Sequence, residues 1–96
     1  MTAVVDGVDV DAVAAAVRRC GSVGGLVDGP PAMAATYLPG RRVDGVRVDG
    51  ETVIIQVSIR PESTVARLAR EVGAAVSRLV PTRRVDIVVA DVSEET

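Results

Sequence analysis

The sequence predicts an α/β fold of the two-layer α+β kind: a small mixed sheet of three to four strands with two helices packed on one face. The main observation is the segment 51–60, where every second residue from position 53 to position 59 is valine or isoleucine. An extended chain points these side chains to one face, and Ile54 on the other face indicates a central strand. Residues 9–19 and 65–79 instead place apolar residues at helical spacing, which predicts two amphipathic helices.

The N-terminal segment predicts a short element followed by the first helix. Residues 1–8 alternate weakly, as in a flexible terminus or a short edge strand. Asp9 or Asp11 can cap a helix that runs through Arg19 and ends at Gly21. The apolar stripe of this helix consists of Val10, Val13, Ala14 and Val17, with Cys20 on its flank.

The glycine-rich segment 21–25 has a G-x-x-G spacing, which also occurs in the backbone-clamping loop of KH domains. That loop joins two helices, whereas Leu26 and Val27 here are typical of a short strand. A flexible turn between helix and strand is the simpler interpretation.

The middle of the chain predicts a loop, a strand and a hairpin. Residues 28–33 contain two prolines and a glycine, which exclude regular structure, and residues 34–38 form a strand that ends at a Pro-Gly turn. Residues 41–49 then predict one strand leading into a hairpin whose turn is Asp49-Gly50. Pairing about that turn places Val46 opposite Val53, so that both apolar rows share one face.

The second helix and the last strand are the clearest elements after the central strand. Ser63 or Thr64 can cap the helix, and Pro81 prevents its continuation. Its predicted buried stripe comprises Val65, Leu68, Ala69, Val72, Val76 and Leu79, and its predicted solvated face comprises Arg67, Arg70, Glu71, Ser77 and Arg78.

Residues 85–92 predict a strand beside the central one. A helix between two strands favours a crossover, and hence a parallel pair. We expect one domain over residues 9–92, with flexible termini at 1–8 and at 93–96, where the sequence is acidic.

The composition argues against several classes of function. The net charge of −2 gives no long-range attraction for nucleic acid or anionic lipid, although all eleven basic residues are arginine. The absence of histidine and the presence of only Cys20 exclude the usual nucleophile–base pairs and the commonest metal ligand, so we expect no catalytic residue and no metal site. Asp44, Asp49 and Glu51 cluster around a hairpin, where turn chemistry already explains them. The sequence contains no membrane span, and residues 1–10 do not resemble a signal peptide.

The candidate binding residues are the single aromatic and two Arg-Arg pairs: Tyr37, Arg41, Arg42, Arg83 and Arg84. Tyrosine and arginine dominate the energetics of protein interfaces, and arginine also binds carboxylates and phosphates bidentately. These residues therefore form an anion- or protein-binding patch if the fold brings them to one edge. The simpler interpretation, which we prefer from the sequence, is that the charges are solvated and Tyr37 is half buried in packing.

One run of residues resembles a known family. The segment 35–43 (ATYLPGRRV), the segments 23–26 and 45–47, and the final strand 85–92 are similar to the alkaline shock protein family, in the short single-domain form of high-GC Gram-positive bacteria. The resemblance covers about residues 9–92, and its strongest part is the Tyr-Leu-Pro-Gly-Arg-Arg run. Many members carry a Tyr-Gly pair before the second helix, where this chain has Ser58-Ile59-Arg60-Pro61.

The resemblance implies a small α/β domain without assigned catalytic residues or cofactor. Family members are associated with cell-envelope stress, lie in the cytoplasm, and in some cases gather at the membrane through a membrane-protein partner. We therefore expect a non-enzymatic cytoplasmic interaction module that forms homo-oligomers or docks on a protein partner, without inserting into the membrane itself. The alternative is a small RNA- or nucleotide-binding domain that uses its Arg pairs; an enzyme is a third option.

Overall fold

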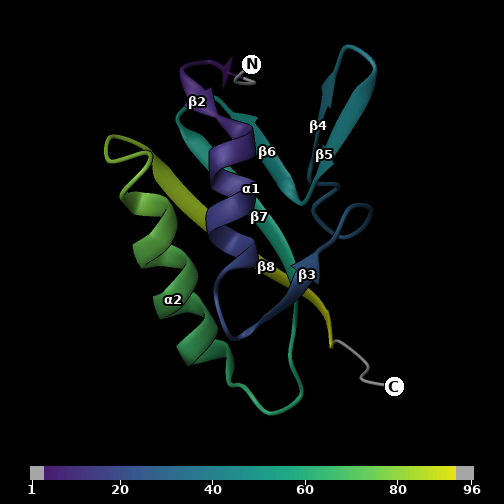
Figure 1. Ribbon diagram of the computed structural model, residues 1–96, viewed down its shortest axis with the longest axis vertical. Coiled ribbons are helices and arrows are strands. Elements are labelled where there is room, and N and C mark those ends of the chain that lie inside the picture. Colours follow the sequence, from purple (N-terminus) through teal and green to yellow (C-terminus); the bar gives the residue numbers. More distant parts are fainter. Residues whose placement is uncertain (1–3, 93–96) are drawn as a thin grey trace.

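The computed structural model describes residues 4–92 of the chain and contains two helices and eight strands in that range (Figure 1). In chain order the elements are β1 (Val4–Val5), β2 (Val8–Asp9), α1 (Val10–Arg18), β3 (Val23–Leu26), β4 (Ala35–Leu38), β5 (Arg41–Asp44), β6 (Val46–Asp49), β7 (Thr52–Ile59), α2 (Val65–Ser77) and β8 (Arg84–Val92). The predicted α+β class is confirmed. The predicted acidic terminus 93–96 lies outside the described residues.

Strand β7 is the centre of a mixed four-stranded sheet, as the apolar alternation predicted. Strand β8 pairs with it in parallel along its whole length, which confirms the expected parallel neighbour. The other edge of β7 is shared, because β6 pairs antiparallel with its first half and β3 with its second half. Both helices lie on one face of this sheet (Figure 1).

The core lies between the helices and β7. The side chains that β7 points toward the helices are all buried: Val53, Ile55, Val57 and Ile59. The predicted stripe of α1 packs against them and is buried throughout. Asp9 caps α1 by accepting a hydrogen bond from the Ala12 backbone N–H at 3.0 Å, as predicted.

The predicted stripe of α2 is too wide. Leu68, Val72 and Val76 are buried, but Val65, Ala69 and Leu79 are exposed. A helix on the outside of a two-layer domain contacts only one layer, so its buried stripe is narrow. Thr64 caps α2 by accepting from the Arg67 N–H at 3.1 Å, which confirms one of the two predicted caps.

The predicted hairpin register is wrong by two residues. Val46 lies opposite Ile55, and Val48 lies opposite Val53, because Asp49 itself pairs with Thr52. The turn therefore consists of Gly50 and Glu51. Since side chains alternate with a period of two, an even shift keeps both apolar rows on the same face.

The predicted single strand 41–49 is broken at Gly45, which has φ +80°. Strand β5 before the break pairs with β4 in a separate two-stranded hairpin, whereas β6 after it joins the main sheet. Figure 1 shows the β4–β5 hairpin extending beyond the main sheet. Gly45 belongs to both parts, since its N–H donates to the Ala34 carbonyl and its own carbonyl accepts from the Gln56 N–H, each at 2.8 Å.

Two segments are more ordered than the sequence indicated. Residues 4–9 form a ribbon of β1 and β2, whose Val8 side chain is buried in the core. The predicted strand at Leu26-Val27 begins earlier, at Val23. The loop predicted at 28–33 is present, and it packs against the buried side chain of Gln56 on the sheet face away from the helices.

Candidate functional site

The predicted binding residues lie in two groups on different parts of the fold. Tyr37, Arg41 and Arg42 lie on the β4–β5 hairpin, which we call the Tyr37 hairpin, and Arg83 and Arg84 lie at the start of β8. No hydrogen bond or ion pair between residues 4 and 92 links the two groups. The Arg-Arg pairs therefore do not form one joint patch through direct contacts.

The Tyr37 side chain is 76% exposed, so the expectation that it is half buried in packing is wrong. It lies directly opposite Arg42 across the two strands of the hairpin, and both side chains therefore stand on the same face. The hairpin is anchored at its base, where the Thr36 hydroxyl donates to the Val46 carbonyl at 2.6 Å. The sole aromatic side chain is thus presented to solvent from a fixed base.

Arg42 is held beside Tyr37 by two carboxylates. Its guanidinium lies 2.6 Å from the Asp44 carboxylate and 3.2 Å from that of Asp28. The charges of Asp44 and Asp28 raise the pKa of Arg42, with a smaller contribution from the Tyr37 side chain. Asp44, considered above for its place in an acidic cluster, thus serves as an ion-pair partner.

Arg41 points to the other side of the hairpin and joins it to α1. Its two terminal nitrogens donate to the two carboxylate oxygens of Asp11, at 3.0 and 2.6 Å. This bidentate contact lowers the pKa of Asp11 and raises that of Arg41. Since both side chains are well exposed, the pair connects the hairpin to α1 but adds little stability.

The second Arg pair has a structural explanation. The Arg83 guanidinium donates to the backbone carbonyls of Gly50, at 2.8 Å, and of Asp6. It thereby joins the β1–β2 turn, the β6–β7 turn and the start of β8. Arg84 pairs with Asp86 on its own strand at 2.9 Å.

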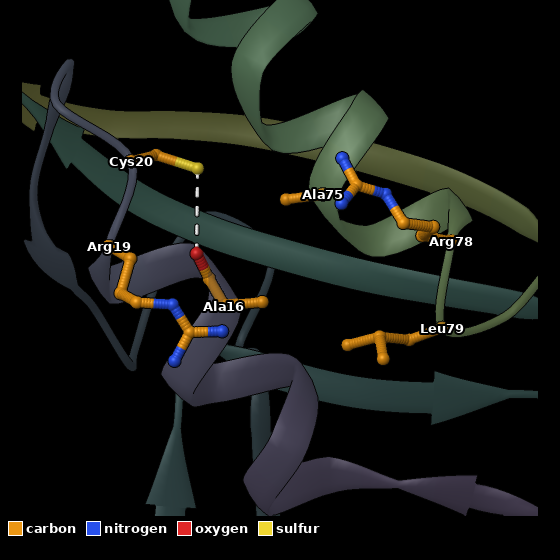
Figure 2. A pocket seen from close by; sticks show the side chains of 6 residues that line it. All are labelled: Ala16, Arg19, Cys20, Ala75, Arg78 and Leu79. Atoms are coloured by element: carbon orange, nitrogen blue, oxygen red, sulfur yellow. Dashed lines mark hydrogen bonds between the residues drawn. The ribbon is translucent and has the colours of Figure 1, made fainter.

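A feature that the sequence did not indicate is a hollow of about 280 Å³ between the C-terminal ends of the two helices (Figure 2). We call it the inter-helix hollow, and its lining residues are Ala16, Arg19, Cys20, Ala75, Arg78 and Leu79. The Cys20 thiol donates to the Ala16 carbonyl oxygen, 3.5 Å from the sulfur. Burial raises the pKa of Cys20, so the thiol is protonated and forms part of an uncharged floor.

Glu71, predicted on the solvated face of α2, instead links the helix to β3. Its carboxylate accepts a hydrogen bond from the Ser22 backbone N–H at 3.0 Å, and this bond lowers the pKa of Glu71. The predicted contact with Arg67 is also present, at 3.7 Å.

The residues from 4 to 92 include no group of three or more histidine, cysteine or acidic side chains placed to hold a metal ion. Neither helix in this range has the length and apolar character needed to cross a membrane.

Comparisons with known proteins give no relative. The chain matches no protein-family model, no curated protein and no solved structure. Membership of the alkaline shock protein family therefore stays a prediction. It rests on the resemblance of the segments 23–26, 35–43, 45–47 and 85–92, which is strongest in the run 37–42.

Proposed function

We propose that this chain is a non-enzymatic interaction module that binds a protein partner, or a second copy of itself, through the Tyr37 hairpin. The observation that carries the proposal is the 76% exposed Tyr37 on a projecting hairpin, opposite the fixed guanidinium of Arg42. An exposed tyrosine offers a large, rigid contact area beside a planar cation, and both residue types are enriched among the side chains that dominate the binding energy of protein interfaces. The cytoplasmic setting, the link to cell-envelope stress and a membrane-anchored partner follow from the family resemblance and belong to the same proposal.

The charges around the hairpin favour a protein over a nucleic acid. Arg42 already faces Asp28 and Asp44, and Arg41 faces Asp11. A phosphate would have to displace these carboxylates and would meet their negative charge. A protein partner that contacts the aromatic ring and the edge of an already neutralised guanidinium does not have to displace the carboxylates, and it is not repelled by their charge.

The test is site-specific photo-crosslinking in the native cell. A photoreactive phenylalanine analogue in place of Tyr37 should give a discrete protein adduct, whereas the same analogue in place of the exposed Ala66 on α2 should not. The adduct should disappear in an Arg42→Ala background and should not return with Arg42→Lys, because an ammonium lacks the planar fork.

The mass of the adduct distinguishes self-association from a different partner. An adduct that nuclease removes would favour the RNA-binding alternative instead. Equal adducts from positions 37 and 66, or none at position 37, would contradict the proposal.

A further inference from the structure

The inter-helix hollow is bordered by two arginines that lack partners. Arg19 is the first residue after α1, and Arg78 is the first residue after α2. Figure 2 shows their side chains extending toward the hollow from opposite walls. Neither guanidinium makes a hydrogen bond or an ion pair with any other residue in the described range 4–92, in contrast to the arginines of the Tyr37 hairpin.

The helix ends alone do not account for this arrangement. A helix C-terminus carries roughly half a negative charge, which favours one basic residue nearby. Two such ends contribute about one negative charge, whereas two guanidiniums contribute two positive charges. No acidic residue lines the hollow. The charge of Glu71 also raises the pKa of Cys20, but this carboxylate lies outside the lining and faces Arg67 at 3.7 Å. The two guanidiniums are the charges that line the hollow without a partner in the described part of the chain, and they are suited to an anion.

The rest of the lining is apolar, and the space is small. Ala16, Ala75 and the protonated Cys20 line it together with Leu79, whose side chain is 46% exposed. A volume of about 280 Å³ lies just below the range of roughly 300–1,000 Å³ that small-molecule and cofactor sites occupy. The hollow thus has room for one or two amino-acid side chains.

We propose that the inter-helix hollow is a docking site for a segment of a partner protein that presents a carboxylate beside a small aliphatic side chain. The carboxylate lies between the guanidiniums of Arg19 and Arg78, which donate to it, and the aliphatic side chain packs on Leu79 and the alanines. Charge complementarity favours an acidic segment, and the apolar floor favours a peptide over a free anion. The hollow shares no residue with the Tyr37 hairpin, so its role is independent of the function proposed for that surface.

The test uses the full chain and a defined probe. Backbone amide spectra are recorded during titration with the acetylated and amidated pentapeptide Ala-Leu-Glu-Val-Ala, with the same peptide carrying Gln for Glu, and with inorganic phosphate. The Glu peptide should shift the amides of Cys20, Ala75 and Leu79 in a saturable way. The Gln peptide should bind at least about tenfold more weakly, because hydrogen bonds to a charged group are the stronger ones.

A matched pair of double variants assigns the effect to the hollow. Arg19→Gln with Arg78→Gln should remove the preference for the Glu peptide. Arg18→Gln with Arg70→Gln removes the same charge from exposed positions on the two helices whose side chains also make no hydrogen bond or ion pair within residues 4–92, and should preserve that preference. All four side chains are exposed, so both proteins should keep the wild-type pattern of amide signals elsewhere.

Three results would overturn the proposal. The first is equal binding of the Glu and Gln peptides, or no shift with either. The second is an equal loss in both double variants, which would mean general attraction by the helical layer. The third is a response to phosphate at lower concentration than to the peptide, which would mean a small-anion site.

Discussion

Gly45 is the position where the fold depends most sharply on one residue, and Gly45→Ala tests this. The backbone there has φ +80°, a left-handed conformation that costs a residue with a Cβ roughly 1–2 kcal/mol. An added Cβ would also lie 2.7 Å from the Gln56 carbonyl oxygen and 2.7 Å from the Leu26 Cβ. Overpacking of this kind typically costs about 1–3 kcal/mol. The sum predicts a loss of about 2–5 kcal/mol in the free energy of unfolding.

Gly40→Ala is the matched control. Gly40 has nearly the same φ, +77°, but an added Cβ there meets no atom within 4 Å. It should therefore carry only the conformational cost of about 1–2 kcal/mol. The difference between the two variants isolates the contact of Gly45 with Gln56 and Leu26.

Urea denaturation measures both losses in the free energy of unfolding. If this free energy falls with urea concentration at the same slope as in the wild type, only the stability has changed. Amide exchange adds a local measurement, because the Gln56 N–H donates to the Gly45 carbonyl at 2.8 Å. The Gln56 amide hydrogen should exchange with solvent faster in Gly45→Ala than in Gly40→Ala. Equal stability losses in the two variants, within about 0.5 kcal/mol, would refute the role assigned to the close contact.

Three other predictions concern the core, the loop and the link between α2 and β3. Leu68→Ala should lower the free energy of unfolding by about 2–5 kcal/mol because Leu68 is fully buried. Leu79→Ala, at an exposed position, should change it by less than about 0.5 kcal/mol. Urea denaturation measures both changes, and similar losses would mean that the buried face of α2 is assigned wrongly. Gln56→Leu should cost about 3 kcal/mol, because it removes three hydrogen bonds to the 27–32 loop from a buried site, and a loss below about 0.5 kcal/mol in the same assay would contradict this. Glu71 has a pKa lowered from its ordinary value of 4.5 by a backbone hydrogen bond, so the stability that its carboxylate adds is complete above that value and is lost as the pH falls through the lowered pKa. The difference in Tm between wild type and Glu71→Gln should therefore shrink between about pH 6 and about pH 3, and a difference independent of pH would contradict the link.

The elements that the sequence predicted well are those defined by local patterns. The stripe of α1 and the alternation of β7 each depend on neighbouring residues, and both are buried as predicted. The parallel placement of β8 followed from the helix that precedes it. The hairpin register was wrong because Asp49-Gly50 and Gly50-Glu51 both make acceptable turns, and a shift of two residues leaves the apolar pattern unchanged.

The features that the sequence did not predict depend on residues far apart in the chain. In the sequence, Gln56 is a single polar residue on the face of β7 opposite the apolar row. Its burial depends on hydrogen bonds that its side chain donates to the loop carbonyls of Val27 and Gly29. The break at Gly45 could not be located from a sequence in which residues 41–49 read as one strand. The candidate residues Tyr37 and Arg42 were identified, but the partners that hold the two arginines of the hairpin were not.

The two proposed surfaces differ in what their arginines can contribute. On the Tyr37 hairpin each arginine already has a carboxylate partner, so binding there gains little from charge and depends on the aromatic ring and on shape. At the inter-helix hollow, Arg19 and Arg78 have no such partner among the described residues, and a ligand carboxylate would supply one. Removal of the ring or of the planar Arg42 guanidinium should therefore abolish binding at the hairpin, whereas the hollow should lose its anion preference when both of its guanidiniums are removed.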